Sequence, residues 1–335
     1  MKPLLFSLSL LLAGSVPALG EDQLPTNDQV LPGLRSFAAQ TARPNGSFRP
    51  GLDPEYTGMS DSAASDLAPP TYAVIVHRTF GWPLPHDAQT RAFFLDRQQK
   101  DGAFVNESGT LDPRSPGARL YNTTQGLVAL HALGAKPRFD PLPVFSAIMQ
   151  GDYKELPPYT TSFFPLAYAT QGKPFPADAD KKIRALMVQD KDGYMHNHVA
   201  NTFHLAHYYS LMKEPTPLAE ALIARILKDQ KADGGWLINP LARDRHATFD
   251  AVFTLKHLGR QRPDCQRATA RAGRWALSCR NADGGFGHYP GSPSDWDAVY
   301  FQVGTLVMAG VLPPARPLPS DARLLGWGHL LAGRE

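Results

Sequence analysis

The sequence predicts an all-α fold, an α/α toroid (α6-α6 barrel) of about six helix-pair repeats. Three observations lead to this fold class. A short phrase recurs along the 335 residues, an amphipathic segment precedes most copies, and a segment that is apolar on all sides follows them. Helices of these two kinds, alternating along the chain, can form two concentric rings, with the apolar helices buried inside.

The recurring phrase is a Gln or its substitute, two or three residues, then Asp-Gly and an aromatic residue. Clear copies span residues 98–104, 189–194, 230–236 and 280–286, with a looser copy at 40–48 and a degenerate one at 150–153. Intervals of roughly 40 to 60 residues indicate a repeat protein made of helix pairs. Because glycine tolerates positive φ, each Asp-Gly is expected to end a helix and turn the chain.

Two kinds of helix flank the phrase. In residues 217–227 apolar side chains recur every three or four positions, which predicts an amphipathic outer helix. Residues 123–133 are apolar almost all round, which predicts an inner helix. The inner helices mostly end at a Gly with a Pro close behind. Counting back ten or eleven residues from these ends puts them in register at Thr71, Thr123, Thr161, Thr202, Thr248 and Val299. A seventh outer segment, residues 320–333, is expected to pack over the closure.

The N-terminus has the pattern of a signal peptide over residues 1–20. Lys2 is followed by an apolar run at 4–12 and by the small-x-small sequence Ala18-Leu-Gly20. The alternative is a buried N-terminal helix. We therefore expect cleavage near Glu21 and one exported domain, periplasmic or secreted, over residues 21–335. No later run reaches 18 apolar residues, so no transmembrane segment is expected in the mature chain.

Charge and cysteine content exclude some classes of protein. The net charge is +3 and 19% of the residues are charged, which is not the footprint of a nucleic-acid or membrane-surface binder. Cys265 and Cys279 are expected on one outer helix, about 21 Å apart. A disulfide needs Cα atoms within about 7 Å, so these cysteines are predicted to be separate, buried thiols.

The repeated phrase resembles that of protein prenyltransferase β subunits and, more distantly, of squalene and terpene cyclases. Three local matches favour the prenyltransferase branch. Residues 67–74 (Leu-Ala-Pro-Pro-Thr-Tyr-Ala-Val) resemble the opening of an inner helix in those subunits, residues 198–203 resemble their His-Gly-Gly-Tyr-Thr-Phe, and residues 284–295 resemble the segment before the last inner helix. The resemblance covers residues 30–312. It implies a toroid, a His at position 198 that binds prenyl diphosphate, a catalytic Zn²⁺ and a separate α subunit.

The zinc site implied by the resemblance is altered in this sequence. The family holds Zn²⁺ with an Asp, a Cys two residues later and a His from the last inner helix. In register, these positions fall on Asp244, His246 and Ala298, so two of the three ligands are replaced. A divalent ion such as Zn²⁺, Mn²⁺ or Fe²⁺ could still bind Asp244, His246 and Asp297. The alternative is that the two carboxylates complement helix dipoles and His246 is a polar rim residue.

Other residues are candidates for a site in the central cavity. His204 and His207 lie three apart on one helix face and, with Asp250, are the catalytic candidates; the alternative for the histidines is a satisfied core position. Arg245 is expected to bind substrate, with Arg243 beside it. One aromatic residue per inner helix is expected to line the cavity or to pack between helices: Tyr72, Tyr121, Phe163, Phe203, Phe249 and Tyr300. His198, Tyr72, Tyr121 and Tyr300 are the other substrate-binding candidates.

Three functions remain open at this stage. The first is a prenyltransferase-like or terpene-cyclase-like toroid, a transferase if active, that binds an apolar, isoprenoid-like ligand but has a degenerate zinc triad. The second is a non-catalytic toroid that binds a protein partner. The third is an exported toroid enzyme that acts on polysaccharide. The sequence contains no Asp-x-Asp-Asp motif for protonation-initiated cyclisation, no Gly-rich phosphate loop and no Gly-x-Ser-x-Gly elbow.

Overall fold

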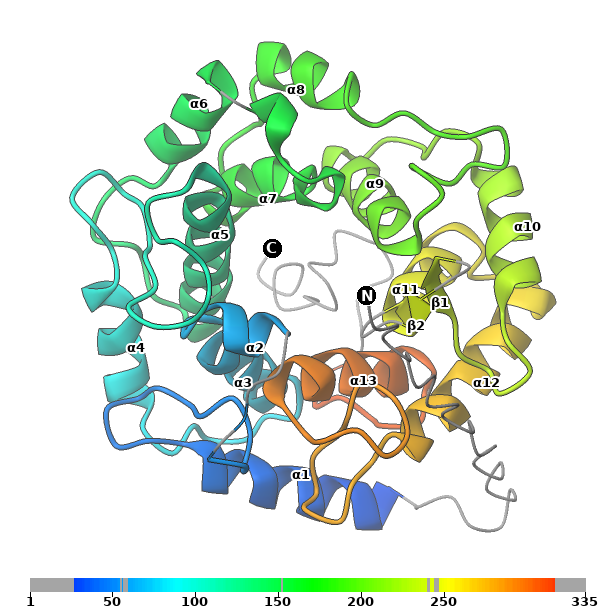
Figure 1. The fold of residues 1–335 in the computed structure, drawn as a ribbon, viewed down its shortest axis with the longest axis horizontal. Helices are drawn as coiled ribbons and strands as arrows, with labels where there is room; N and C mark the ends of the chain where they lie inside the picture. The colour runs from blue at the N-terminus through cyan, green and yellow to red at the C-terminus, as the bar shows by residue number, and fades with distance from the viewer. Residues whose placement is uncertain are drawn as a thin grey trace, which may run out of the picture.

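The computed structural model describes residues 27–54, 56, 60–151, 153–239, 242–243 and 247–316. Within these ranges, helices of two sets alternate along the chain and form two concentric rings (Figure 1). The outer ring contains α1 (Asn27–Thr41), α4 (Asp87–Asp96), α6 (Leu142–Gln150), α8 (Ala177–Arg184), α10 (Ala219–Asp229) and α12 (Pro263–Ser278). The inner ring contains α3 (Ala68–Thr79), α5 (Pro116–Leu133), α7 (Phe163–Thr170), α9 (Val199–Met212), α11 (Ala247–Leu258) and α13 (Trp296–Met308).

The predicted fold class is confirmed. Each inner helix packs against the next one, and the last, α13, packs against the first, α3, so the inner ring is closed. Short elements join the rings: α2 (Asp61–Ala64), the 3-10 turns η2 (Tyr153–Glu155) and η3 (Pro158–Thr160), and an antiparallel pair of β1 (Leu237–Asn239) and β2 (Ala242–Arg243). No helix of the described ranges is both long and apolar enough to cross a bilayer. The predicted seventh outer segment, residues 320–333, lies outside those ranges.

The repeated phrase forms a turn that joins successive outer helices. In the copy at 230–236, the Gln230 side chain donates to the carbonyl oxygen of Gly234 at 2.9 Å and to that of Ala268, on the next outer helix, at 2.8 Å. Asp233 accepts from the Gly235 N–H at 3.0 Å. Gly234 has φ +98°, and a Cβ there would meet the backbone of Arg271. The phrase therefore ends one outer helix and holds the next outer helix in place through hydrogen bonds and backbone contact.

Two of the threonines that set the register of the inner helices, Thr123 and Thr248, accept a hydrogen bond from the phrase. The Oγ1 of Thr123 accepts from the Phe104 N–H at 3.1 Å, and that of Thr248 accepts from the Trp236 N–H at 3.1 Å. The helices do not begin at these threonines, however. Helix α5 begins seven residues before Thr123, because Pro116 suits a first helical position and Ser115 caps the Ala118 N–H at 3.2 Å.

The degenerate copy of the phrase at 150–153 does not form this turn. Gly151 has φ −100°, whereas the glycines of the clear copies lie in the left-handed region, between +87° and +98°. The chain continues instead through η2 and η3 before α7. The prediction for the cysteines is confirmed: Cys265 and Cys279 are both free and buried.

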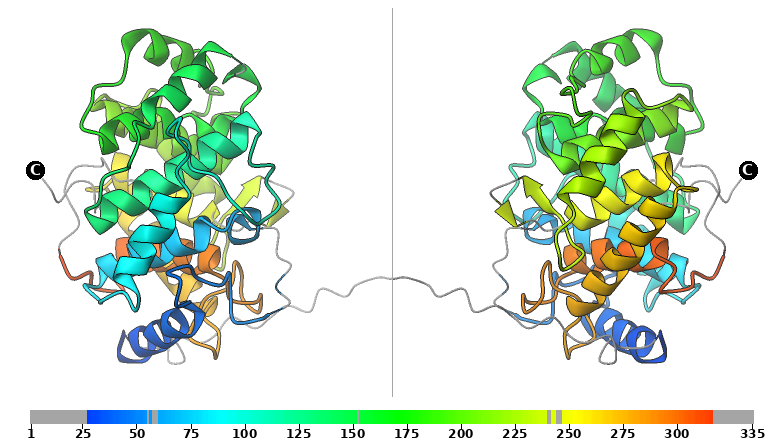
Figure 2. Two further views of the ribbon diagram at one scale, coloured as in Figure 1. Left: turned by 90° about the vertical axis from the view of Figure 1, so that its left-hand side faces the viewer. Right: turned by 90° about the vertical axis from the view of Figure 1, so that its right-hand side faces the viewer.

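The seam of the toroid, where the segment after α12 meets α1, uses the same phrase. Arg280 stands in the Gln position and donates to the Gln29 carbonyl oxygen at 3.1 Å. Gly284, φ +87°, lies against the backbone of Gly33 on α1. Both views of Figure 2 show α1 and the orange segment after α12 together at the lower edge. The last copy of the phrase thus binds the first outer helix as the copy at 230–236 binds the next outer helix.

Candidate ligand cavity and metal centre

The inner helices enclose a cavity of about 640 Å³. Within the described ranges, seven site residues predicted from the sequence line it: Tyr72, Tyr121, His198, His204, His207, Asp250 and Tyr300. The other three predicted aromatics, Phe163, Phe203 and Phe249, also line it. A volume of this size is in the range of pockets for small organic ligands, about 300–1,000 Å³.

The wall carries a continuous belt of aromatic side chains, with at least one from each inner helix. Tyr72 stacks on Tyr300 with centroids 4.5 Å apart, and Tyr300 contacts Phe249 at 6.1 Å. Phe249 contacts Phe203 at 5.7 Å, and the Phe203 ring meets that of the neighbouring His204 at 4.7 Å.

The other side of the cavity completes the belt. His204 meets Phe163 at 5.4 Å, and Phe163 meets Tyr121 at 6.4 Å. The hydroxyl oxygens of Tyr121 and Tyr72 are 3.4 Å apart. The belt surrounds the cavity because the inner helices are in register and place one aromatic residue at a similar level. Such a wall suits an apolar chain.

A polar cluster, formed by the Asp61 carboxyl group and the hydroxyl groups of Tyr72 and Tyr121, lies in this wall beside α2. Tyr72 donates its hydroxyl proton to Asp61 Oδ2 at 3.1 Å, and Asp61 also lines the cavity. Burial, reinforced by the charge of Asp61, raises the pKa of Tyr72 and Tyr121 well above the usual value. Both hydroxyls therefore stay protonated. This end of the cavity presents hydroxyl groups and a carboxyl group.

The histidines of the fourth inner helix have three different environments. His198 caps α9, its Nδ1 accepting from the Asn201 N–H at 3.4 Å. The Nδ1 of His204 shares a hydrogen bond of 2.7 Å with the Ser162 hydroxyl. His207 stacks on Phe203 at 5.6 Å, and burial lowers its pKa to about 3. His207 is therefore neutral at physiological pH.

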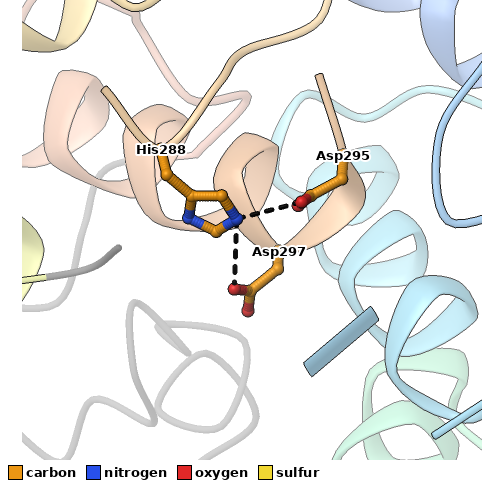
Figure 3. Close-up of side chains that lie close together, drawn as sticks. All are labelled: His288, Asp295 and Asp297. Carbon is orange, nitrogen blue, oxygen red and sulfur yellow. Dashed lines mark hydrogen bonds and ion pairs between the residues drawn. The ribbon is translucent and has the colours of Figure 1, made fainter. Parts of the chain in front are cut away.

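A second cluster lies at the start of α13, beside the seam. His288 Nε2 is 2.9 Å from Asp295 Oδ2 and 3.7 Å from Asp297 Oδ2 (Figure 3). One ligand atom from each of the three residues lies within 4.8 Å of the others, so the group could hold a metal ion. Both carboxyl groups are almost fully buried. Figure 3 shows the imidazole pointing toward them, between the loop after Phe286 and the first turn of the helix.

Neighbouring groups hold Asp295 in place. Its Oδ1 accepts from the Ala298 N–H at 2.8 Å, which caps α13, and its Oδ2 accepts from the hydroxyl of Tyr56. Burial alone would raise the pKa of Asp295, but the hydrogen bond and charge of His288 lower it overall. The Asp297 N–H donates to Ser62 Oγ at 2.9 Å. The cluster therefore also ties α13 to the first repeat.

The structure places Asp297 in this cluster, with two residues that the sequence did not identify as ligands. Asp295 ends the matched segment 284–295 and His288 lies inside it, but the sequence pattern assigned neither of them as a ligand. Their proximity depends on the Tyr289–Ser292 turn, which is closed by a hydrogen bond of 3.0 Å. The predicted site residues Asp244, Arg245 and His246 lie outside the described residues. Ala298, which the sequence register matches to the zinc-binding His of prenyltransferase β subunits, is fully buried.

Two rings of helices around an aromatic-lined cavity define an α/α toroid. The family model that describes the prenyltransferase alpha-alpha toroid domain matches residues 8–329. The chain belongs to this family, and the resemblance inferred from the sequence is confirmed. No curated protein sequence matched the chain.

Solved structures show the same fold at low sequence identity. Protein geranylgeranyltransferase-I of Candida albicans, complexed with GGPP, aligns with a TM-score of 0.62 and 10% identity, over 80% of this chain and 91% of that one. The type II terpene cyclase MstE from Scytonema, in complex with its product merosterolic acid A, aligns with a TM-score of 0.57 and 14% identity, over 85% of this chain and 99% of that one. The same cyclase in complex with geranylgeranyl dihydroxybenzoate aligns with a TM-score of 0.55 and 12% identity, over 85% of this chain and 97% of that one.

Proposed function

We propose that this toroid binds an isoprenoid-like molecule in its central cavity. The observation that carries the proposal is the closed aromatic belt, which gives a long apolar chain contact on every side. Relatives in fold bind such molecules: the geranylgeranyltransferase is complexed with GGPP, and MstE with geranylgeranyl dihydroxybenzoate. No described feature of the structure favours the protein-interaction toroid or the polysaccharide enzyme over this function.

Filling the cavity tests the proposal. Val128 is a half-buried residue of the cavity wall, so Val128→Trp is expected to weaken binding of a fluorescent geranylgeranyl probe at least tenfold. Leu218→Trp is the control, since Leu218 is 50% exposed before an outer helix. Equal probe binding by both variants, at similar melting temperatures, would refute the cavity as the site.

The cluster of His288, Asp295 and Asp297 is proposed to hold a divalent cation. One imidazole and two carboxylates suit Zn²⁺, Mn²⁺ or Fe²⁺. Ligand atoms about 3.4 Å apart are expected around tetrahedral Zn²⁺ with bonds of about 2.1 Å, so separations of 2.9 and 3.7 Å fit after small shifts. When bound, the ion would act as a Lewis acid.

Metal content tests this site without any assay of activity. We expect one equivalent of Zn²⁺ to bind to metal-free protein, and His288→Ala to lower the affinity at least 100-fold in competition with a chromophoric chelator. His86→Ala, before an outer helix, is the control. Negligible binding to the wild-type protein would show that the cluster is an ion pair only.

We further propose that the protein is exported and that its mature chain begins near Glu21. The basic start, apolar run and small-x-small sequence of residues 1–20 support this. N-terminal sequencing of the protein recovered from the periplasm or medium locates the cleavage site. Recovery of the intact chain from the cytosol alone would refute export.

A further inference from the structure

The polar groups of the cavity wall indicate which kind of head group an isoprenoid ligand carries. Two carboxyl groups, of Asp61 and Asp250, line the cavity. The lining that the structure describes includes no Lys or Arg side chain. His207, which also lines it, is kept neutral by burial. Apart from its histidines, the ionisable groups of the described wall are therefore carboxyl groups and tyrosine hydroxyls.

A diphosphate fits this wall poorly. A buried charge is costly unless a partner of opposite sign and hydrogen bonds compensate it. Two like charges 4 Å apart repel by about 4 kcal/mol at an effective dielectric constant of 20. An anionic head near Asp61 would meet repulsion from that carboxylate, and the described lining holds no Lys or Arg side chain to offset it.

The hydrogen-bonding capacity at Asp61 also favours an uncharged head group over a diphosphate. A carboxylate only accepts hydrogen bonds, and the nearby Tyr72 hydroxyl already donates its proton to Asp61 Oδ2 at 3.1 Å. The Tyr121 hydroxyl oxygen lies 3.4 Å from that of Tyr72. With the Tyr72 proton on Asp61, the Tyr121 hydroxyl donates to Tyr72, so a head group in this place must itself donate a hydrogen bond to Asp61. A hydroxyl group can donate this hydrogen bond, whereas a fully ionised diphosphate can only accept.

From these observations we infer that the cavity selects an uncharged, hydroxyl-bearing isoprenoid over a prenyl diphosphate, with the hydroxyl donating to Asp61. The inference rests on the proposed function and specifies its ligand class. It also differs from the expectation that Arg245, outside the described residues, helps to bind a diphosphate.

A competition experiment separates the two ligands. Geranylgeraniol is expected to displace a fluorescent geranylgeranyl probe at concentrations at least tenfold lower than geranylgeranyl diphosphate does. Asp61→Asn keeps the size of the side chain but removes its charge. It should weaken binding of geranylgeraniol about fivefold, and it should reduce or reverse the preference for the alcohol over the diphosphate. Asp96→Asn, at the end of an outer helix, is the matched control and should change neither.

Each other outcome has a distinct meaning. If the diphosphate binds as tightly as the alcohol or more tightly, the inference is overturned while the proposed function stands. Loss of that diphosphate binding in Arg243→Ala/Arg245→Ala would then identify the groups that hold it. If neither ligand competes and the probe does not bind, the proposed function fails and the inference falls with it.

Discussion

Gly284→Ala is expected to lower the free energy of unfolding by about 2–5 kcal/mol, because it places a methyl group inside the seam of the toroid. A non-glycine residue in the left-handed region costs about 1–2 kcal/mol, and overpacking adds about 1–3 kcal/mol. The new Cβ would lie 2.2 Å from the Gly33 carbonyl oxygen. Backbone on both sides of the contact leaves no flexible side chain to give way.

Gly291→Ala is a closely matched control. Gly291 has φ +84°, close to the +87° of Gly284, but a Cβ there meets nothing within 4 Å. Its substitution should cost only the backbone strain of about 1–2 kcal/mol. The shift of the urea midpoint at unchanged m-value measures both losses. Equal losses in the two variants would show that contact across the seam does not limit stability.

Trp296→Ala is expected to destabilise the protein by a similar amount, about 3–5 kcal/mol. Trp296 is fully buried at the start of α13, where its ring lies 5.5 Å from Phe37 and 5.6 Å from Phe48. Its indole N–H donates to Thr41 Oγ1 at 3.0 Å. These contacts all reach the first repeat, so the truncation leaves a cavity at the seam.

Two milder substitutions separate packing from hydrogen bonding at this tryptophan. Trp296→Phe keeps most of the apolar volume and should cost about 1–2 kcal/mol, and Thr41→Ala should cost about 1–3 kcal/mol by leaving the indole N–H unsatisfied. Urea denaturation of the three variants gives the comparison. If Trp296→Ala lowers the free energy of unfolding no more than Trp296→Phe does, packing across the seam contributes little to stability.

The seam also matters for the cavity. Tyr72 on α3 and Tyr300 on α13 stack across it, with centroids 4.5 Å apart. The aromatic belt is therefore continuous only while the last inner helix lies beside the first. A seam variant that remains folded should bind the geranylgeranyl probe more weakly, because one side of the apolar wall is loosened.

Local regularities made the cavity residues accessible to sequence reasoning. The phrase and the helix ends define a register, and in that register Tyr72, Phe203, Phe249 and Tyr300 each lie one residue after the reference position of their inner helix. Helices of a closed ring present equivalent positions to the same centre. For this reason the aromatic residues selected from the sequence all line the cavity.

The metal cluster could not be found in the same way. His288 precedes α13 by eight residues, and the turn at Tyr289–Ser292 brings its ring back to Asp295. Tyr56, which donates to the same carboxylate, lies 239 positions earlier in the chain. No periodicity links these residues, because a local turn brings His288 to the two carboxyl groups and closure of the ring brings Tyr56 to Asp295.

By itself, the sequence determined the helical repeat, the turn at each Asp-Gly and the family, because these depend on residues a few positions apart. Only the tertiary structure decided that Arg280 and Gly284 meet the first outer helix, and that His288 lies between two buried carboxyl groups. The cluster itself forms through a local turn, but the contacts of Tyr56 and Ser62 with its carboxyl-bearing residues, like those of Arg280 and Gly284, join opposite ends of the chain. They depend on the summed rotation of every repeat between them, which no local pattern of residues encodes.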